Sequence, residues 1–264
     1  MFYGRLLRER VRHHRAPHSL MAVRPTLSYF ELRGRAEASR LLLGDLGVEF
    51  IDRRITSPEE WEALKQDVPF GGLPRYQDER VDLTQSHAIL RYLARTQGLV
   101  GLDGLPGEND AAAWVVYDEI QEVLSETQEH LWRFAWEADY QDTGETYANG
   151  ILRWFLGALQ QWYSEHGEGE YWVGDTISHI DYLAFAYLDE VRAFFPETLA
   201  RVELLAAFHA RMQARPRIAE YIDSGHRPVV FGMAVDGPKV DPDVTLEPGQ
   251  MFHNPWTQPI VLGG

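Results

Sequence analysis

The strongest constraint on the fold of this chain is an alternation of strand-like and helical patterns through residues 24–97. Strands are predicted where β-branched and aromatic residues cluster, and helices where apolar residues recur three or four positions apart. The helix predicted over 33–46, for example, has Leu42, Leu43 and Leu46 on one face. In chain order the prediction is strand, helix, strand, helix, hairpin and helix, over 26–30, 33–46, 48–55, 58–65, 74–76 with 80–83, and 86–95.

This order of elements is that of an α/β thioredoxin-like domain, which we expect over residues 24–97. Glycine and proline over 97–107 are typical of a linker. Beyond it the pattern is helical, with amphipathic stretches over 110–138 and 143–165 that are separated by a break near 141–144. A capping box at Ser178 and Asp181 starts a further helix. Helices are also predicted over 199–214 and 217–223, so an all-α helical domain is expected over 108–224.

Two terminal segments lie outside these domains. Residues 1–23 form a basic extension rich in arginine and histidine, for which two interpretations stay open. One is an organelle transit peptide, since such peptides are rich in arginine and poor in acids, and the other is an extended start ahead of Met21. Residues 225–264 hold six of the 14 prolines and no helical period. They predict an irregular tail that wraps the surface or stays loose.

Composition excludes several classes of function. A formal net charge of −15 argues against nucleic acid or an anionic membrane as the main partner. No apolar run approaches the roughly 18 residues that a membrane helix needs, and a cytoplasmic location is expected. The chain has no cysteine, which excludes disulfides, thiolate metal sites and a cysteine nucleophile, and no metal site is predicted. Thiol chemistry would therefore need a thiol that arrives with a substrate.

Three motifs in the first domain are more specific. YFELRGRAE occupies residues 29–37, WEALK and PFGGLP occupy 61–65 and 69–74, and QSHAILRYL occupies 85–93. In these motifs the chain resembles the sigma class of cytosolic glutathione transferases, strongly over 24–95 and more loosely over the helical half. The resemblance implies a thioredoxin-like domain followed by a helical domain, glutathione as co-substrate, a small electrophile as second substrate, and a homodimer.

The chemistry explains why such a protein needs the tyrosine of the first motif. A thiol with a pKa near 8.5 is mostly protonated at neutral pH, yet the thiolate is the nucleophile. A tyrosine hydroxyl that donates a hydrogen bond to the sulfur stabilises the thiolate and lowers the pKa of the thiol. The resemblance places Tyr29 in this role and Arg35 as a source of positive field beside the phenol.

The resemblance also implies a set of glutathione contacts. Leu73 and Pro74 match the position of a cis proline in the family, with an ordinary trans proline at an edge strand as the alternative. Gln85 and Ser86 begin a helix, whose free N–H groups suit the γ-glutamyl carboxylate. Trp61 and Lys65 match residues at the glycyl end. The complete set is Tyr29, Phe30, Arg35, Trp61, Lys65, Leu73, Pro74, Gln85, Ser86 and, from the partner subunit, Glu122.

The chain departs from the family pattern at Gly72, where a lysine would reach the glycyl carboxylate. Loss of a partly exposed charge there weakens binding by on the order of 1 kcal/mol, and Lys65, Arg53 and Arg75 are candidates to compensate. For the acidic residue of the partner subunit that reaches the γ-glutamyl amine, Glu122 is the first candidate and Asp118 the second.

Aromatic residues over 132–140 have two possible roles. Trp132, Phe134, Trp136 and Tyr140 either line a pocket for apolar, planar electrophiles or pack the core of the helical domain. In the tail, Phe231, Met233 and Trp256 are candidates to close over the same cleft.

The sequence therefore predicts a glutathione transferase of detoxification type that conjugates the glutathione thiolate to apolar electrophiles. Two alternatives remain open: a glutathione-dependent isomerase or peroxidase that uses the same thiolate, and a non-catalytic relative that serves as a structural or assembly module.

Overall fold

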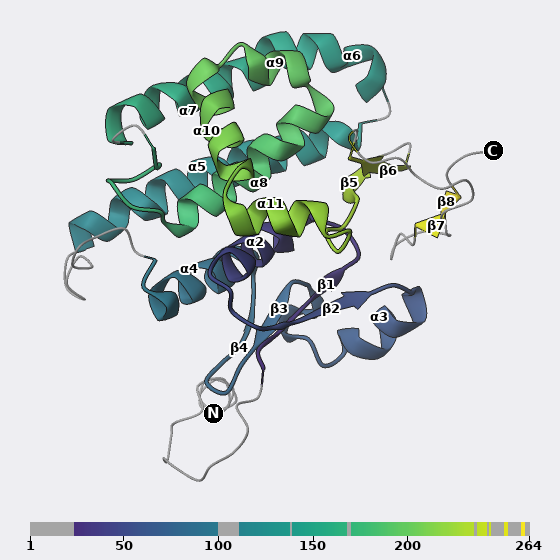
Figure 1. Cartoon of the computed structure of the whole chain (residues 1–264). Helices are drawn as coiled ribbons and strands as arrows, with labels where there is room; N and C mark the ends of the chain where they lie inside the picture. The colour runs from purple at the N-terminus through teal and green to yellow at the C-terminus, as the bar shows by residue number, and fades with distance from the viewer. Residues whose placement is uncertain are drawn as a thin grey trace, which may run out of the picture.

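The computed structural model describes residues 24–99, 111–137, 139–167, 170–234, 237–241, 243, 251–252 and 260–261. A four-stranded sheet lies at one end of the molecule, and a layer of helices is stacked on it (Figure 1). The strands are β1 (Thr26–Phe30), β2 (Ile51–Ile55), β3 (Arg75–Gln77) and β4 (Asp82–Thr84), in the order β2-β1-β3-β4. β1 is parallel to β2 and antiparallel to β3, which is antiparallel to β4.

The helices of this part are η1 (Gly34–Ala36), α2 (Glu37–Asp45), α3 (Pro58–Lys65), η2 (Pro69–Gly71) and α4 (Ser86–Gln97). α2 and α4 lie between the sheet and the helical part, whereas α3 lies apart from them (Figure 1). Ser57 caps α3 by accepting a hydrogen bond from the Glu60 N–H, and Pro58 opens it. The predicted order of elements is confirmed, although the hairpin strands lie one or two residues later than expected.

The helical part consists of α5 (Ala111–Ala135), α6 (Tyr140–Tyr147), the π-helical turn η3 (Ala148–Leu152), α7 (Arg153–His166), α8 (His179–Phe194), α9 (Pro196–Ala200), α10 (Glu203–Gln213) and α11 (Pro216–Asp223). α8 is buried along most of its length and packs against α2, which joins the two parts of the molecule. The predicted capping box is present: Ser178 accepts from the Ile180 N–H, and Asp181 accepts from the Ser178 N–H.

Several helix boundaries in the helical part differ from the prediction. The break predicted near 141–144 falls earlier in the chain. α5 ends at Ala135, and residues 141–144 are helical within α6. The polar run predicts a loop, but the Tyr147 ring stacks on Phe134 at 3.9 Å between centroids, and this contact fixes α6. Tertiary packing here overrides local propensity. The helix predicted over 199–214 is divided into α9 and α10 at Val202, whose backbone is not helical.

The tail is partly regular rather than irregular throughout. β5 (Val230–Ala234) and β6 (Gly237–Val240) form an antiparallel hairpin, and β7 (Met251–Phe252) pairs with β8 (Ile260–Val261). Val230 and Phe231 are buried, so this section of the tail packs on the body of the protein. The basic extension over 1–23 and most of the linker lie outside the described residues. Within those residues, no helix combines the length and the apolar character needed to cross a bilayer.

Candidate active site

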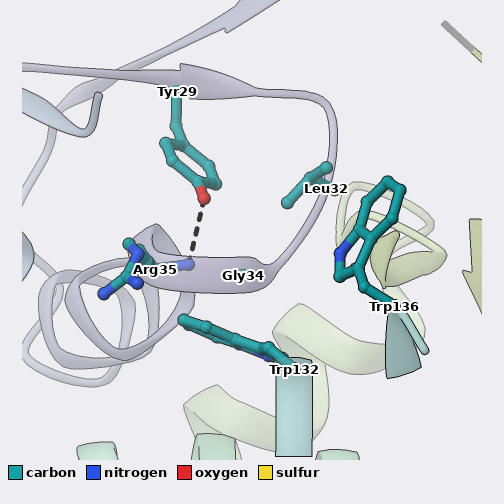
Figure 2. A pocket seen from close by; sticks show the side chains of 7 residues that line it. Tyr29, Leu32, Gly34, Arg35, Trp132 and Trp136 are labelled. Atoms are coloured by element: carbon teal, nitrogen blue, oxygen red, sulfur yellow. Dashed lines mark hydrogen bonds between the residues drawn. The ribbon is translucent and has the colours of Figure 1, made fainter. Parts of the chain in front are cut away.

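Tyr29 lies near the end of β1 with its side chain 6% exposed. Its hydroxyl accepts a hydrogen bond of 3.2 Å from the backbone N–H of Arg35, at the start of the helical segment that follows (Figure 2). Gly34 makes this approach possible. A Cβ at Gly34 would lie 2.8 Å from the Tyr29 hydroxyl and 2.6 Å from Leu32 Cδ1, and the φ of +39° also disfavours a side chain.

Burial raises the pKa of Tyr29 above its ordinary value, and the Arg35 hydrogen bond and the charges of Arg35 and Arg40 act in the opposite direction. The Arg40 guanidinium lies 5.8 Å from the centre of the Tyr29 ring. A raised pKa keeps the phenol protonated at neutral pH. The hydroxyl is therefore available as a hydrogen-bond donor to an anion beside it.

Arg35 faces the same space as Tyr29. Its guanidinium stacks over the Trp132 ring at 4.7 Å and pairs with Glu129 at 3.3 Å, with both charged side chains partly exposed. Trp132 is held in turn by Glu190 on α8, which accepts a hydrogen bond of 3.0 Å from the indole N–H. Burial raises the pKa of Glu190 to about 8, against the hydrogen bonds from Gln128 and Trp132.

A cavity of about 330 Å³ opens beside the Tyr29 hydroxyl. Its lining residues come from β1 and the following turn, α5 with the turn after it, and β5: Tyr29, Leu32, Gly34, Arg35, Trp132, Trp136 and Gly232. Figure 2 shows Tyr29 and the two tryptophans around this space. The aromatic residues over 132–140 have both of the roles considered for them, pocket lining and core packing. Trp132 and Trp136 line the cavity, whereas Phe134 and Tyr140 are buried in the core.

Of the three tail residues predicted to close over the cleft, Phe231 is not found there. Phe231 is 1% exposed beneath the Arg33 guanidinium and does not line the cavity. The lining residue of the tail is its neighbour Gly232. Trp256 and the side chain of Met233 lie outside the described residues.

Trp61 and Lys65, the residues predicted at the glycyl end of glutathione, lie on α3. Phe30 packs on Tyr29 and meets the Trp61 ring edge-on, each with centroids 5.4 Å apart. The Lys65 ammonium lies 5.9 Å from the centre of the Trp61 ring.

The Leu73–Pro74 peptide bond is cis, as the resemblance implies. Pro74 is buried and Leu73 partly buried.

Gln85 and Ser86 mark the beginning of α4. Gln85 has φ 76° and ψ 112°, a conformation that is uncommon for a residue other than glycine and that clusters at functional sites. The Gln85 side chain is exposed and makes no capping hydrogen bond. Ser86 shares a narrow recess with Gly34 and Arg35, so the start of α4 and the turn after Tyr29 face each other.

Lys65 is the best placed of the three candidates to compensate for Gly72. Arg75 is bound to Asp82 by two hydrogen bonds of 2.8 and 2.6 Å, and Arg53 pairs with Glu60 at 3.3 Å. Among the described residues, the ion pair of Lys65 is a long, exposed contact of 3.7 Å with Glu62. The Lys65 side chain also lies beside Gly71, the residue before Gly72, since a Cβ at Gly71 would lie 3.9 Å from Lys65 Cγ.

Glu122 and Asp118 lie on α5 and contact Arg91 of α4 in the same chain. Arg91 donates to Asp118 at 2.8 Å and to Glu122 at 3.2 Å. Glu122 remains 68% exposed. These contacts join the middle of α4 to the first half of α5.

Sequence reasoning missed two residues of this region. Glu190 had a usable signal, since it is a carboxylate in the otherwise apolar run of a buried helix. Gly232 had none, because only its place in β5 brings it to the cavity. Among the described residues, no group of His, Asp and Glu could hold a metal ion.

The structure joins a thioredoxin-like unit to a helical unit and has a cavity beside a buried tyrosine, an arrangement typical of an enzyme. Residues 25–95 match the model of the glutathione S-transferase N-terminal domain, and residues 125–225 match that of the glutathione S-transferase C-terminal domain. The chain belongs to the glutathione S-transferase family, a family of enzymes that use glutathione as co-substrate.

Relatives support this assignment over most of the chain. It is 35% identical to a glutathione S-transferase of Dirofilaria immitis, over 74% of this chain and 90% of that protein. The solved Pi-class glutathione S-transferase of Onchocerca volvulus superposes with a TM-score of 0.69 at 32% identity, over 76% and 93%. The sigma-class enzyme of Fasciola hepatica shares the fold, with a TM-score of 0.66 at 23% identity, over 76% and 96%.

Proposed function

We propose that Tyr29 donates its hydroxyl hydrogen bond to the glutathione sulfur, and that the resulting thiolate attacks an apolar electrophile bound in the adjoining cavity. The observation that carries the proposal is the position of Tyr29: buried, anchored through its oxygen by the Arg35 N–H, and at the wall of an apolar cavity. Burial raises the pKa of the Tyr29 phenol above its ordinary value, so the phenol is protonated at neutral pH and can donate this hydrogen bond.

The reaction needs no acid or base from the protein beyond this donor. The glutathione thiol releases its proton to solvent on binding, because the Tyr29 hydrogen bond and the Arg35 charge favour the thiolate. The sulfur lone pair then forms a carbon–sulfur bond to the electrophile, and the leaving group departs with the electrons of the bond that breaks. The indole rings of Trp132 and Trp136 hold the apolar part of the electrophile.

Glutathione would bind along the edge formed by α3, the loop before β3 and the start of α4. The free N–H groups at Ser86 suit the γ-glutamyl carboxylate, and the cis peptide before Pro74 presents backbone groups to the tripeptide. Lys65 takes the place of the lysine that Gly72 replaces. We place the enzyme in the cytoplasm as a homodimer with a role in detoxification, in which Glu122 of one subunit reaches the γ-glutamyl amine bound by the other.

The variant Tyr29→Phe tests the assignment. A hydrogen bond to a charged group contributes about 1.5–3 kcal/mol, so kcat/KM for conjugation should fall roughly 10- to 150-fold. The pKa of bound glutathione, followed by thiolate absorbance, should return towards 8.5. Tyr117→Phe is the matched control, since it removes a buried hydroxyl that has no hydrogen-bond partner among the described residues.

Retention on immobilised glutathione completes the test. Wild type that is not retained would support the non-catalytic alternative. Wild type that is retained, with unchanged activity in Tyr29→Phe, would assign thiol activation to another group. An isomerase or a peroxidase would lose activity in Tyr29→Phe as well, and it is distinguished by the absence of a conjugated product.

A further inference from the structure

The tail contributes buried charges to the body of the protein although it lies beyond the matched family domains. The C-terminal domain model ends at residue 225. Arg227, two residues later, is buried and pairs with Glu37 of α2 at 2.7 Å and with Asp189 of α8 at 2.8 Å. Asp241 is also buried. Residues 226–234 and 237–241, which we call the tail wall, are therefore fixed to both parts of the molecule.

Arg33 is the main anchor of the tail wall. Its backbone N–H donates to the Val230 carbonyl at 2.8 Å, and its Nε donates to the Pro228 carbonyl at 2.7 Å. Its guanidinium pairs with Asp241 and lies 3.9 Å from the centre of the Phe231 ring. Arg33 directly precedes Gly34, so the turn that receives the Tyr29 hydroxyl also holds the tail wall.

This anchorage places a backbone segment at the cavity. The pairing of β5 with β6 shifts between Val230 and Gly232, where Phe231 is the extra residue of a β-bulge. Phe231 turns its ring under Arg33, and Gly232 faces the cavity with Trp132 and Trp136. β5 packs against α5, near its C-terminal end in Figure 1. A Cβ at Gly232 would meet no atom within 4 Å, so the space in front of this glycine belongs to the cavity.

We propose that the tail wall determines which electrophiles the enzyme accepts, with Gly232 leaving room for a planar aromatic electrophile larger than one ring. The proposal rests on the proposed function, because it assigns the electrophile to this cavity. The rings of Trp132 and Trp136 offer flat apolar surface, and the missing side chain at Gly232 extends the space between them. A side chain there would shorten the cavity without disturbing the packing around it.

Graded substitution at Gly232 tests the proposal in the full-length enzyme. Gly232→Ala, Gly232→Val and Gly232→Phe add increasing bulk, and Gly157→Ala, Gly157→Val and Gly157→Phe are matched controls at an exposed glycine of α7 that also has no atom within 4 Å of its Cβ. The probes are benzyl bromide and 1-naphthylmethyl bromide, which share the reacting carbon and differ by one ring. Glutathione binding is measured for every variant by calorimetry.

We expect kcat/KM for the naphthyl probe to fall stepwise, by about 10-fold or more in Gly232→Phe, with a change of less than about 3-fold for the benzyl probe. Glutathione affinity should not change. Equal losses for the two probes, or no loss for either, would overturn the role of the tail wall while leaving the proposed function in place. A wild-type enzyme that conjugates neither probe despite binding glutathione, or that binds no glutathione, would overturn the proposed function instead.

Discussion

At Gly34 the backbone passes so close to Tyr29 that no side chain fits. We predict that Gly34→Ala lowers kcat/KM by about 10-fold or more, because the new Cβ would displace the hydroxyl from which it would lie 2.8 Å. The positive φ adds strain, so the free energy of unfolding should fall by about 1–3 kcal/mol. Gly157→Ala in α7, where nothing crowds the Cβ, should be neutral or slightly stabilising. Steady-state kinetics and urea denaturation measure both effects, and unchanged kinetics in Gly34→Ala would contradict the tight approach.

Glu190 makes stability depend on pH in a direction opposite to that of an ordinary carboxylate. Its pKa is about 8 in the folded protein against 4.5 for a free side chain. Between these values the unfolded chain has lost the proton that the folded protein keeps, so the stability contributed by this group is lost as pH rises through that window. We predict that Glu190→Gln, which keeps an acceptor for Trp132, gains on the order of 3 kcal/mol relative to wild type between pH 5 and pH 8.5.

Urea midpoints at the two pH values measure this gain. The difference between variant and wild type isolates Glu190 from other groups such as His179, whose pKa burial lowers to about 3. Glu119→Gln, at an exposed position of α5, should follow the wild-type profile. Parallel profiles for Glu190→Gln and wild type would show that Glu190 is ionised in the folded protein.

Residues tied to a local motif could be predicted, and residues brought in by long-range packing could not. The cis bond at Pro74 follows from the motif in which it lies, and the structure confirms it. Gly232 reaches the cavity through long-range contacts of the tail, among them the hydrogen bonds from Arg33, 199 positions earlier, to the carbonyls of Pro228 and Val230. Nothing within a few residues of Gly232 encodes that contact. The roles assigned to Tyr29 and Arg35 stay predictions, although the structure brings the two residues together.

At the scale of elements, the distinction between local motifs and long-range packing explains which helix and strand boundaries were predicted correctly. β1 and α3 occupy the predicted residues, since a β-rich run encodes the first and a Ser57–Pro58 start encodes the second. The break predicted at 141–144 was wrong because α6 depends on long-range contacts of Tyr147, whose ring stacks on Phe134 of α5 and also contacts Phe195, the residue directly after α8. The hairpin of β5 and β6 was missed because its glycines and prolines are typical of a loop.

The attachment of the tail to α2 and α8 gives a prediction about these elements. Arg227→Met should lower the free energy of unfolding by about 3–5 kcal/mol, because it leaves the buried carboxylates of Glu37 and Asp189 without one of their partners. Burial opposes ionisation of Asp189, but the hydrogen bond to His209 and the charges of Arg227 and Arg33 hold its pKa below the ordinary value. Denaturation at neutral pH measures the loss. Arg133→Met, at an exposed pair on α5, should cost less than about 1 kcal/mol. Similar losses for the two variants would mean that the tail is not held by this network.

At the scale of the whole molecule, the proposed site needs two subunits, and this can be tested by complementation. Tyr29→Phe lacks the thiol donor, and Glu122→Ala lacks the carboxylate proposed to act across the interface. In a heterodimer of the two variants, one site carries both defects and the other carries neither. Mixing, unfolding and refolding the two inactive or weakened proteins should therefore restore about a quarter of wild-type activity, since half of the dimers are mixed and each has one intact site.

The position of Glu122 also allows it to act within its own subunit, which predicts a different result. Glu122 contacts Arg91 within its own chain at 3.2 Å, while most of its side chain is exposed. If Glu122 acts only through Arg91 in the same subunit, every site in the mixture keeps one defect, and refolding restores nothing beyond the average of the parents. Sedimentation of the mixture shows that dimers have formed, and Glu119→Ala in place of Glu122→Ala controls for the loss of an acidic side chain from α5. A monomer in sedimentation would remove the proposed role of Glu122 altogether.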